Sequence, residues 1–221
     1  MRYYPVLLDV RDQRCIIVGA GAVGERKAVT LLNCRAKVEL IGKILSSTLA
    51  DLVKEHRVKY LGNQYNDFYL EEAFLVIAAT DDSALNYRIA EDARRRGILY
   101  NTVDRPDLCS FIVPSIINRG DLIVAFSTSG KSPAFAKKLR MEFEEVFGKE
   151  YEVFLDLMGR IRERVLCKSQ DSSKNREIFE QLVYSPVLGW IKKGDVESLD
   201  NLLINLLGEE YSLKELGITV R

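Results

Sequence analysis

Short apolar runs alternate with amphipathic stretches over the first half of the chain. The apolar runs are expected to form β-strands, at residues 14–18, 36–41, 57–61, 73–79 and 97–101. Helices or helical turns are expected between them, at residues 25–33, 47–55, 67–72 and 83–96. Strands that alternate with helices are typical of a parallel sheet with right-handed crossovers. The pattern therefore predicts an α/β fold with an N-terminal Rossmann-type parallel sheet.

The pattern changes after residue 105. Residues 110–117 and 122–127 predict two strands around a tight turn at 118–121. Pro114 lies within the first of them, which indicates an edge strand or a bulge. These strands lack the helices that accompany the first domain, and a long apolar hairpin cannot stay exposed. We therefore expect this segment to pair with a partner chain.

The remainder of the chain is predicted to be helical. Residues 133–146 form one helix that starts at Pro133, and residues 149–207 give three or four further amphipathic helices that pack on one another. The polar segment 168–174 is expected to be a mobile linker. Three parts follow from these patterns: a Rossmann domain at 1–108, a dimerisation segment at 109–147 and a C-terminal helical domain at 148–221.

Composition narrows the class of protein. The chain has 221 residues, of which 47% are hydrophobic, so it can build a core in one large domain or two small ones. Lysine plus arginine and aspartate plus glutamate number 32 each, which gives no indication of nucleic-acid binding. No apolar run approaches the roughly 20 residues that span a bilayer, and residues 1–9 do not form a signal peptide. We expect a cytoplasmic protein without membrane or nucleic-acid partners.

Cysteine and histidine offer little material for a metal site. The cysteines are widely scattered, at Cys15, Cys34, Cys109 and Cys167, and form no C-x-x-C pair, so neither a zinc site nor a disulfide framework is indicated. Cys15 is expected in the core of a buried strand. His56 is the only histidine and is expected at the surface. No metal site and no Ser-His-Asp triad are predicted.

A glycine-rich turn joins the first strand to the first helix. Its sequence, Gly-Ala-Gly-Ala-Val-Gly over residues 19–24, matches the dinucleotide-binding fingerprint in the context that the fingerprint requires. Gly19 allows the tight turn, Gly21 lets the backbone approach a pyrophosphate, and Gly24 lets the helix pack close to the strand. Glycines alone often only make a turn, but strand, turn and helix together predict a cofactor site that includes Ala22 and Val23.

The ends of the second and fourth strands are expected to complete this site. A Rossmann site usually carries a carboxylate at the tip of the second strand, yet Glu39 lies inside that strand and the tip holds Lys43 and Ile44. Lys43 would attract a 2′-phosphate and favour NADP, or it is simply a loop lysine, so the residues leave NAD against NADP open. Thr80 and Asp81 follow the fourth strand and are expected at the same edge of the sheet.

Several motifs together resemble one family. In this chain they lie at residues 11–12, 19–28, 78–82, 101–104, 110–115 and 127–133. Their order and spacing resemble those of precorrin-2 dehydrogenase, the N-terminal module of siroheme synthase, over about residues 3–140. The C-terminal helices match this family only in type and length. No methyltransferase domain follows, so the chain resembles the stand-alone form.

The resemblance implies oxidation of precorrin-2 to sirohydrochlorin with NAD⁺ as hydride acceptor. Some members of the family also insert Fe²⁺ as a ferrochelatase to give siroheme, and the sequence does not separate this bifunctional form from a dehydrogenase that relies on another chelatase. The resemblance also implies a homodimer that exchanges residues 110–140, and it favours NAD. A nucleotide-sensing regulatory module is a third alternative, but it gives no reason for Asp104 or for the 127–133 motif.

Asp104 matches the catalytic aspartate of that family. It follows the fifth predicted strand, at the ligand edge of the sheet, where a carboxylate can accept the proton that leaves the tetrapyrrole during oxidation. It could also accept pyrrole protons during metal insertion. The alternative is that Asp104 caps a turn before Arg105 and Pro106.

The motif at residues 127–133 is expected to bind the carboxylates of the substrate. It follows a strand and precedes a helix, so its backbone N–H groups and a lysine suit an anion. The predicted substrate-binding residues are Thr128, Ser129, Gly130 and Lys131. Further cationic candidates, each of which also fits a solvated helix face, are Arg119, Lys137, Lys138 and Arg140.

Overall fold

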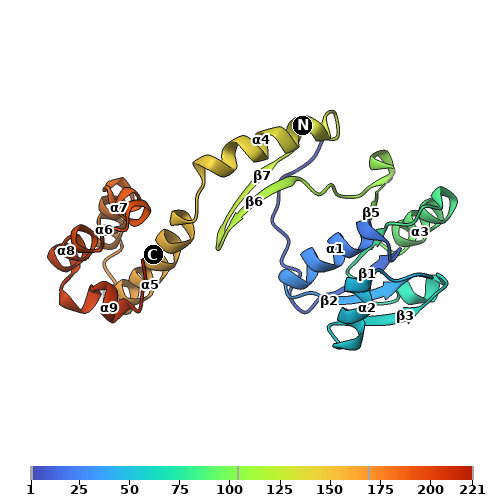
Figure 1. Ribbon diagram of the computed structural model, residues 1–221, viewed down its shortest axis with the longest axis horizontal. Coiled ribbons are helices and arrows are strands. Elements are labelled where there is room, and N and C mark those ends of the chain that lie inside the picture. The colour runs from blue at the N-terminus through green and yellow to red at the C-terminus, as the bar shows by residue number, and fades with distance from the viewer. Residues whose placement is uncertain (1, 104, 169, 221) are drawn as a thin grey trace. The chain divides into compact units, whose positions relative to one another are not determined.

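The computed structural model describes residues 2–103, 105–168 and 170–220. The chain divides into two compact units, Met1–Val113 and Pro114–Arg221, each with its own internal contacts (Figure 1).

The first unit holds a parallel sheet in the order β3-β2-β1-β4-β5. Its strands are β1 (Arg14–Val18), β2 (Lys37–Ile41), β3 (Val58–Gly62), β4 (Leu75–Ala78) and β5 (Leu99–Thr102). Its helices are α1 (Ala22–Asn33), α2 (Ser47–Lys54) and α3 (Ser83–Arg95), with 3₁₀ turns η1 (Asp67–Leu70) and η2 (Pro106–Leu108). The α/β fold and its parallel sheet are thereby confirmed, with strand ends that differ from the predicted ones by at most two residues.

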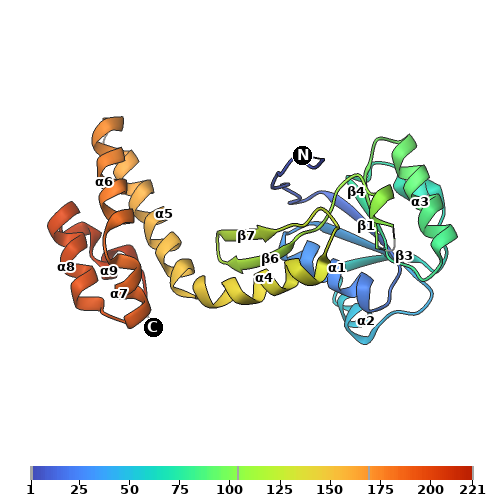
Figure 2. The ribbon, with the colours of Figure 1, turned by 90° about the horizontal axis from the view of Figure 1, so that it is seen from above.

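Both faces of this sheet are buried. Along β1, Cys15 and Ile17 belong to the core beneath α1 and α2, whereas Ile16 and Val18 belong to the core beneath α3 and η1. Figure 2 shows α1 and α2 on one side of the strands and α3 on the other. A parallel strand buried on both faces needs apolar side chains at every position, which is why the runs were recognisable in the sequence.

Glu39 is a charged exception within β2. Its carboxylate lies 2.6 Å from the guanidinium of Arg14 on β1 and 3.0 Å from the ammonium of Lys59 on β3. Burial raises the pKa of Glu39, but the hydrogen bonds from Arg14 and Lys59 outweigh it and the pKa is lowered overall. Glu39 therefore ties three strands together and is not the carboxylate of a nucleotide site.

The second unit begins with the antiparallel hairpin of β6 (Ser115–Arg119) and β7 (Leu122–Phe126). The expectation of a strand over 110–117 is wrong for residues 110–114. Ser110 instead binds the edge of β5, where its hydroxyl accepts from the N–H of Tyr100 at 2.8 Å. Pro114 then lacks the N–H that a ladder needs, so regular pairing starts at Ser115.

One face of the hairpin is covered by α4 (Pro133–Val146), which lies alongside it (Figure 1). The expectation that the hairpin has no helical cover is therefore wrong for this face, where Ile117 is buried. The opposite face stays open, because Ile116 and Ile123 are 41% and 45% exposed. The alternation of β-strand side chains thus separates a covered face from an exposed one.

The rest of the second unit is helical, as predicted. It comprises α5 (Glu150–Lys168), α6 (Ser172–Tyr184), α7 (Val187–Lys193), α8 (Val196–Leu207), the 3₁₀ turn η3 (Glu209–Tyr211) and α9 (Leu213–Leu216). Leu157 and Ile161 of α5 share one core with Leu199 and Leu203 of α8. No helix within the described residues is long and apolar enough to cross a membrane.

The linker between α5 and α6 is shorter than the expected segment 168–174. Helix α6 already begins at Ser172, because the side chain of Asp171 accepts hydrogen bonds from the N–H groups of Ser173 and Lys174. The prediction of a linker is therefore wrong for residue 168, which ends α5, and for residues 172–174. Residue 169 lies outside the described residues.

Candidate functional site

The glycines at positions 19, 21 and 24 have three different environments. A side chain at Gly19, whose φ is +116°, would overlap the carbonyl of Ala79 at the end of β4, and one at Gly24 would overlap the carbonyl of Gly19. At Gly21 a Cβ would meet nothing within 4 Å. Gly19 and Gly24 are therefore required by packing, whereas the backbone of Gly21 faces open space that can receive a ligand.

Helix α1 begins at Ala22, three residues earlier than expected, directly after this open position. Gly21 stands at its N-cap and carries no side chain that could accept from the first-turn amides. By contrast, Ser46 and Asp82 cap α2 and α3 with their side chains. The amides at the start of α1 are therefore available to an anion, and they fit the pyrophosphate of a dinucleotide.

Residues 42–44, which follow β2, form a loop beside the glycine turn. A Cβ at Gly42 would lie 2.6 Å from the Cβ of Ala20, so this loop packs closely on the glycine turn. The hydroxyl of Tyr60 donates to the carbonyl of Gly42 at 2.9 Å. Lys43 and Ile44 follow, both exposed, Ile44 by 84%. Sequence reasoning missed Tyr60, which lies on the neighbouring strand β3 and fixes the 42–44 loop through this hydrogen bond.

The end of β4 is shaped by a buried amide that the sequence analysis also missed. Asn86 of α3 is only 1% exposed, accepts from the hydroxyl of Thr80 at 2.7 Å and donates to the carbonyl of Thr80 at 2.9 Å. Thr80 is therefore held in place by Asn86, whereas Asp81 is exposed at the ligand edge. The sequence signal that could have revealed Asn86 is its position beside Ile89 on the buried face of α3.

Asp104, the predicted catalytic residue, lies outside the described residues. The loop that contains it leaves β5 beside the end of β4, since the N–H of Val103 donates to the carbonyl of Ala78 at 3.1 Å. The hydroxyl of Thr102 donates to the carbonyl of Arg105 at 2.8 Å. The chain before and after position 104 is thus held at the ligand edge of the sheet, and the role of Asp104 stays a prediction.

Lys27 is a further cation in this unit that the sequence analysis did not single out. It lies on α1, one turn beyond the glycine turn, and is half-buried. Burial and then the neighbouring Arg26 lower the pKa of Lys27, and Cys109 is close enough to act on it electrostatically.

The loop at residues 127–132 uses several of its own amides. The N–H of Ser129 donates to the hydroxyl of Ser127 at 3.1 Å. The N–H groups of Lys131 and Ser132 donate to the carbonyl and hydroxyl oxygens of Thr128, both at 3.0 Å. These three amides are therefore not free for an anion, contrary to the expected backbone cradle. The exposed side chains of Ser129 and Lys131 and the backbone at Gly130 are what the loop offers a ligand.

The other cationic candidates divide into two groups. Arg119 of β6 donates to the carbonyl of Phe147 at 2.8 Å and so ties the hairpin to the end of α4. Arg140 and Lys138 each form an ion pair within α4, with Glu144 and Glu142 respectively. Lys137 and Lys138 are exposed, which is the solvated position that substrate binding would require.

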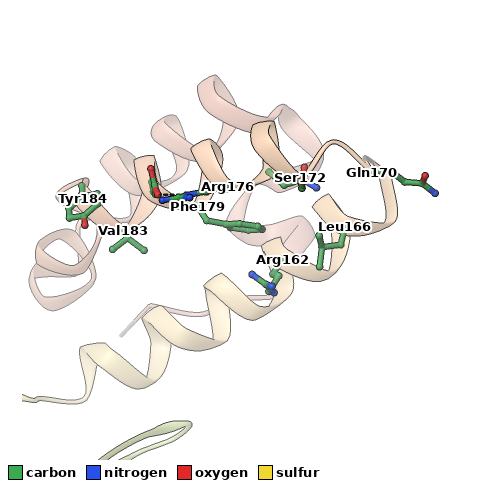
Figure 3. A pocket seen from close by; sticks show the side chains of 10 residues that line it. Arg162, Leu166, Gln170, Ser172, Arg176, Phe179, Val183 and Tyr184 are labelled. Atoms are coloured by element: carbon green, nitrogen blue, oxygen red, sulfur yellow. Dashed lines mark hydrogen bonds and ion pairs between the residues drawn. The ribbon is translucent and has the colours of Figure 1, made fainter.

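A separate groove of about 660 Å³ lies between α5 and α6 in the second unit (Figure 3). Leu166, Phe179 and Val183 line it with apolar surface, and the guanidinium of Arg162 lies 5.3 Å from the centre of the Phe179 ring. None of the predicted site residues that the structure describes lines this groove.

Comparison with known proteins gives the chemical class of the first unit. Residues 6–115 match the protein family described as putative NAD(P)-binding. The chain is 36% identical over 190 residues to a siroheme synthase of Nitrosospira multiformis, covering 84% of this chain and 40% of that protein. It is 32% identical over 206 residues to a siroheme synthase of Photobacterium profundum, covering 93% of this chain and 44% of that protein.

The chain is a homologue of siroheme synthases. The resemblance that the motifs indicated is thereby confirmed. This siroheme synthase homologue spans about two fifths of the length of the relatives it matches. Its glycine turn falls within the NAD(P)-binding match, which supports a nicotinamide cofactor at that turn.

A solved structure shows the same fold. The precorrin-2 dehydrogenase SirC superimposes with a TM-score of 0.75 and 18% sequence identity, over 90% of this chain and 100% of that one. In the siroheme synthase homologue described here, no group of three or more His, Cys, Asp or Glu side chains is placed to hold a metal ion within the described ranges.

Proposed function

We propose that this protein oxidises precorrin-2 to sirohydrochlorin with NAD⁺ in siroheme biosynthesis. The observation that carries the proposal is the open backbone of Gly21 ahead of α1, whose N-cap has no side chain, in a homologue of siroheme synthases. The names of the relatives and of the structural neighbour support the pathway and the substrate.

Each residue of the site has a part in this reaction. The first-turn amides of α1 and the backbone at Gly21 bind the pyrophosphate. Asp81 and the 42–44 loop, with Lys43 and Ile44, lie on either side of the cofactor. NAD⁺ supplies the hydride acceptor when it is bound. Oxidation removes one hydride and one proton from the tetrapyrrole, and Asp104 accepts the proton.

The carboxylates of precorrin-2 need cationic and hydrogen-bonding partners. We assign this role to Lys131 and Ser129, with Thr128 and Gly130 shaping the loop. The exposure of Ser129, Gly130 and Lys131 supports the assignment. The loop conformation supports it as well, because Ser129 and Gly130 have φ angles of +54° and +83° that turn the backbone sharply before α4.

The test of the proposed function is a direct assay. Purified protein is mixed with precorrin-2 and NAD⁺, and the appearance of NADH and of the sirohydrochlorin spectrum is followed. Fe²⁺ is then added as a possible second substrate. Sirohydrochlorin without siroheme indicates the dehydrogenase alone, and siroheme indicates the bifunctional form. Absence of NADH formation would refute the proposed function.

Cofactor preference gives the first specific prediction. We expect NAD⁺ to bind more tightly than NADP⁺, as the family resemblance favours, although no carboxylate at residues 42–44 repels a 2′-phosphate. Lys43→Asp should therefore weaken NADP⁺ binding further, by charge repulsion, and change NAD⁺ binding little. Calorimetric Kd values for both cofactors test this, with Lys54→Asp at the end of α2 as a control. Tighter binding of NADP⁺ by the wild type would contradict the choice of NAD⁺.

Self-association is the second prediction. We propose a homodimer formed through residues 110–140, supported by the exposed apolar face of the hairpin at Ile116 and Ile123 and by exposed Phe135 and Met141 on α4. Light scattering at micromolar concentration should give twice the mass of one chain. Ile123→Glu should shift the protein toward monomer, whereas Val183→Glu, at an exposed position of α6, should not. A monomeric wild type would overturn the proposal.

A further inference from the structure

The carboxylate that usually stands at the tip of the second strand of a Rossmann site is absent here for a steric reason. The tip falls at Gly42, directly after β2. A Cβ at this position would lie 2.6 Å from the Cβ and 3.0 Å from the backbone nitrogen of Ala20, so an aspartate does not fit unless the glycine turn moves. Glu39, the carboxylate within β2, is already paired with Arg14 and Lys59. The ribose hydroxyls of a dinucleotide therefore need another acceptor.

The side chain of Tyr60 reaches this tip from the neighbouring strand β3. Val58 of β3 belongs to the core beneath α1 and α2, and Tyr60, two residues further along the strand, lies on the same face of the sheet. Tyr60 is 39% exposed, and its hydroxyl lies 2.9 Å from the carbonyl oxygen of Gly42. The phenol oxygen is thus at the ligand edge, on the face that carries α1.

The hydrogen bond to Gly42 decides what the phenol can offer a ligand. The hydroxyl of Tyr60 donates its only hydrogen to that carbonyl, so its oxygen is left as an acceptor, as a carboxylate oxygen is. The position of the tip is fixed as well, because the N–H of Gly19 donates to the carbonyl of Ile41 at 2.8 Å and the N–H of Gly42 donates to the carbonyl of Gly62 at 3.0 Å. A ribose hydroxyl can donate to the phenol oxygen, whereas the acceptor oxygens of a 2′-phosphate cannot.

We propose that Tyr60 replaces the absent carboxylate, and that its hydroxyl oxygen accepts a hydrogen bond from the 2′-hydroxyl of the adenosine ribose of NAD⁺. The inference rests on the proposed function, in which the dinucleotide binds at the glycine turn. In this fold the ribose of the adenosine half lies at the tip of the second strand. Tyr60 then favours NAD⁺ over NADP⁺ without a negative charge, and the discrimination is smaller than a carboxylate gives because no charge repels the phosphate.

Calorimetry with three ligands tests this contact without an activity assay. The ligands are NAD⁺, NADP⁺ and the NAD⁺ analogue that contains 2′-deoxyadenosine. Wild-type protein should bind NAD⁺ about 3- to 10-fold more tightly than the deoxy analogue, which is the range of one hydrogen bond between neutral groups. In Tyr60→Phe this ratio should fall to about one, because the partner of the 2′-hydroxyl is lost. The preference for NAD⁺ over NADP⁺ should narrow in the same variant.

The ratio separates a ribose contact from a purely structural role. If Tyr60 only fixed the 42–44 loop, Tyr60→Phe would weaken NAD⁺ and the deoxy analogue equally, and the ratio would stay at its wild-type value.

Tyr69→Phe is the matched control. The hydroxyl of Tyr69 also donates to a backbone carbonyl, that of Leu61, at 3.0 Å. Both residues pack against the core on the other face of the sheet, beneath α3 and η1. Tyr69→Phe should therefore keep both ligand ratios of the wild type, and circular dichroism checks that each variant is folded.

The outcomes are distinguishable. A wild type that binds neither NAD⁺ nor NADP⁺ overturns the proposed function and this inference with it. A wild type that binds NAD⁺ and the deoxy analogue equally well overturns the role of Tyr60 alone, and this measurement needs no variant. An unchanged ratio in Tyr60→Phe overturns it too, since another group must then hold the 2′-hydroxyl.

Discussion

Replacement of Asp104 by alanine is expected to lower the rate of precorrin-2 oxidation by about 10²- to 10⁴-fold, the range typical of general acid–base catalysis. The carboxylate is proposed to take the proton that leaves with the hydride, and without it water must do so. NAD⁺ affinity should not change, because the glycine turn proposed to bind the pyrophosphate is intact. Steady-state kinetics and calorimetry on the same preparation measure both quantities.

Asp107→Ala is the matched control for this variant. Asp107 lies in the same loop, but its exposed carboxylate pairs with Arg105 at 2.7 Å, so its loss should change kcat only slightly. If the protein also inserts Fe²⁺, the two rates need not fall equally in Asp104→Ala, since water can replace the carboxylate more easily in one step than in the other. Rates within a few-fold of wild type in both steps would show that Asp104 is only a turn residue.

The second large effect is expected at Gly21. Gly21→Asp should abolish NAD⁺ binding while the fold is retained. The φ angle of Gly21 is −81° and a Cβ there meets nothing within 4 Å, so the protein itself tolerates a side chain. The added carboxylate would occupy the space of the pyrophosphate and repel it. Calorimetry with NAD⁺ measures the loss, and circular dichroism checks the fold.

Gly24→Ala is the comparison for Gly21→Asp, because it should lower the stability of the fold itself. Its Cβ would overlap the carbonyl of Gly19, so α1 must move away from the turn. Overpacking of this kind costs about 1–3 kcal/mol or more in the free energy of unfolding, which urea denaturation measures. Unchanged NAD⁺ affinity in Gly21→Asp would refute the assignment of the cofactor site.

The sheet and the glycine turn could be predicted from sequence because both depend on local pattern. Residues 15–18 of β1 and 75–78 of β4 form unbroken apolar runs, as in Ile16 and Ile17, and the roles of Gly19 and Gly24 follow from the fingerprint. The helix at Pro133–Val146 was also predicted with its observed bounds, since proline marks its start.

What the sequence did not reveal depends on contacts between distant residues. Asn86 and Tyr60 support the site through hydrogen bonds to Thr80 and Gly42, and nothing local to either residue announces its partner. The cover that α4 gives to one hairpin face has the same origin. The amides used within the 127–132 loop are a different case, because they donate to oxygens only two to four residues away along the chain. The conformation of that loop decides which of its amides remain free for a ligand.

The start of α1 has a consequence for work with the cofactor-free protein. Because Gly21 offers no side chain to the first-turn amides, inorganic anions such as phosphate or sulfate can occupy the same place. Any solute that binds only the folded state raises its apparent thermal stability and competes with other solutes for the site. Melting temperatures and apparent NAD⁺ affinities of this protein will therefore depend on the buffer salt, and anion-poor buffers give the intrinsic values.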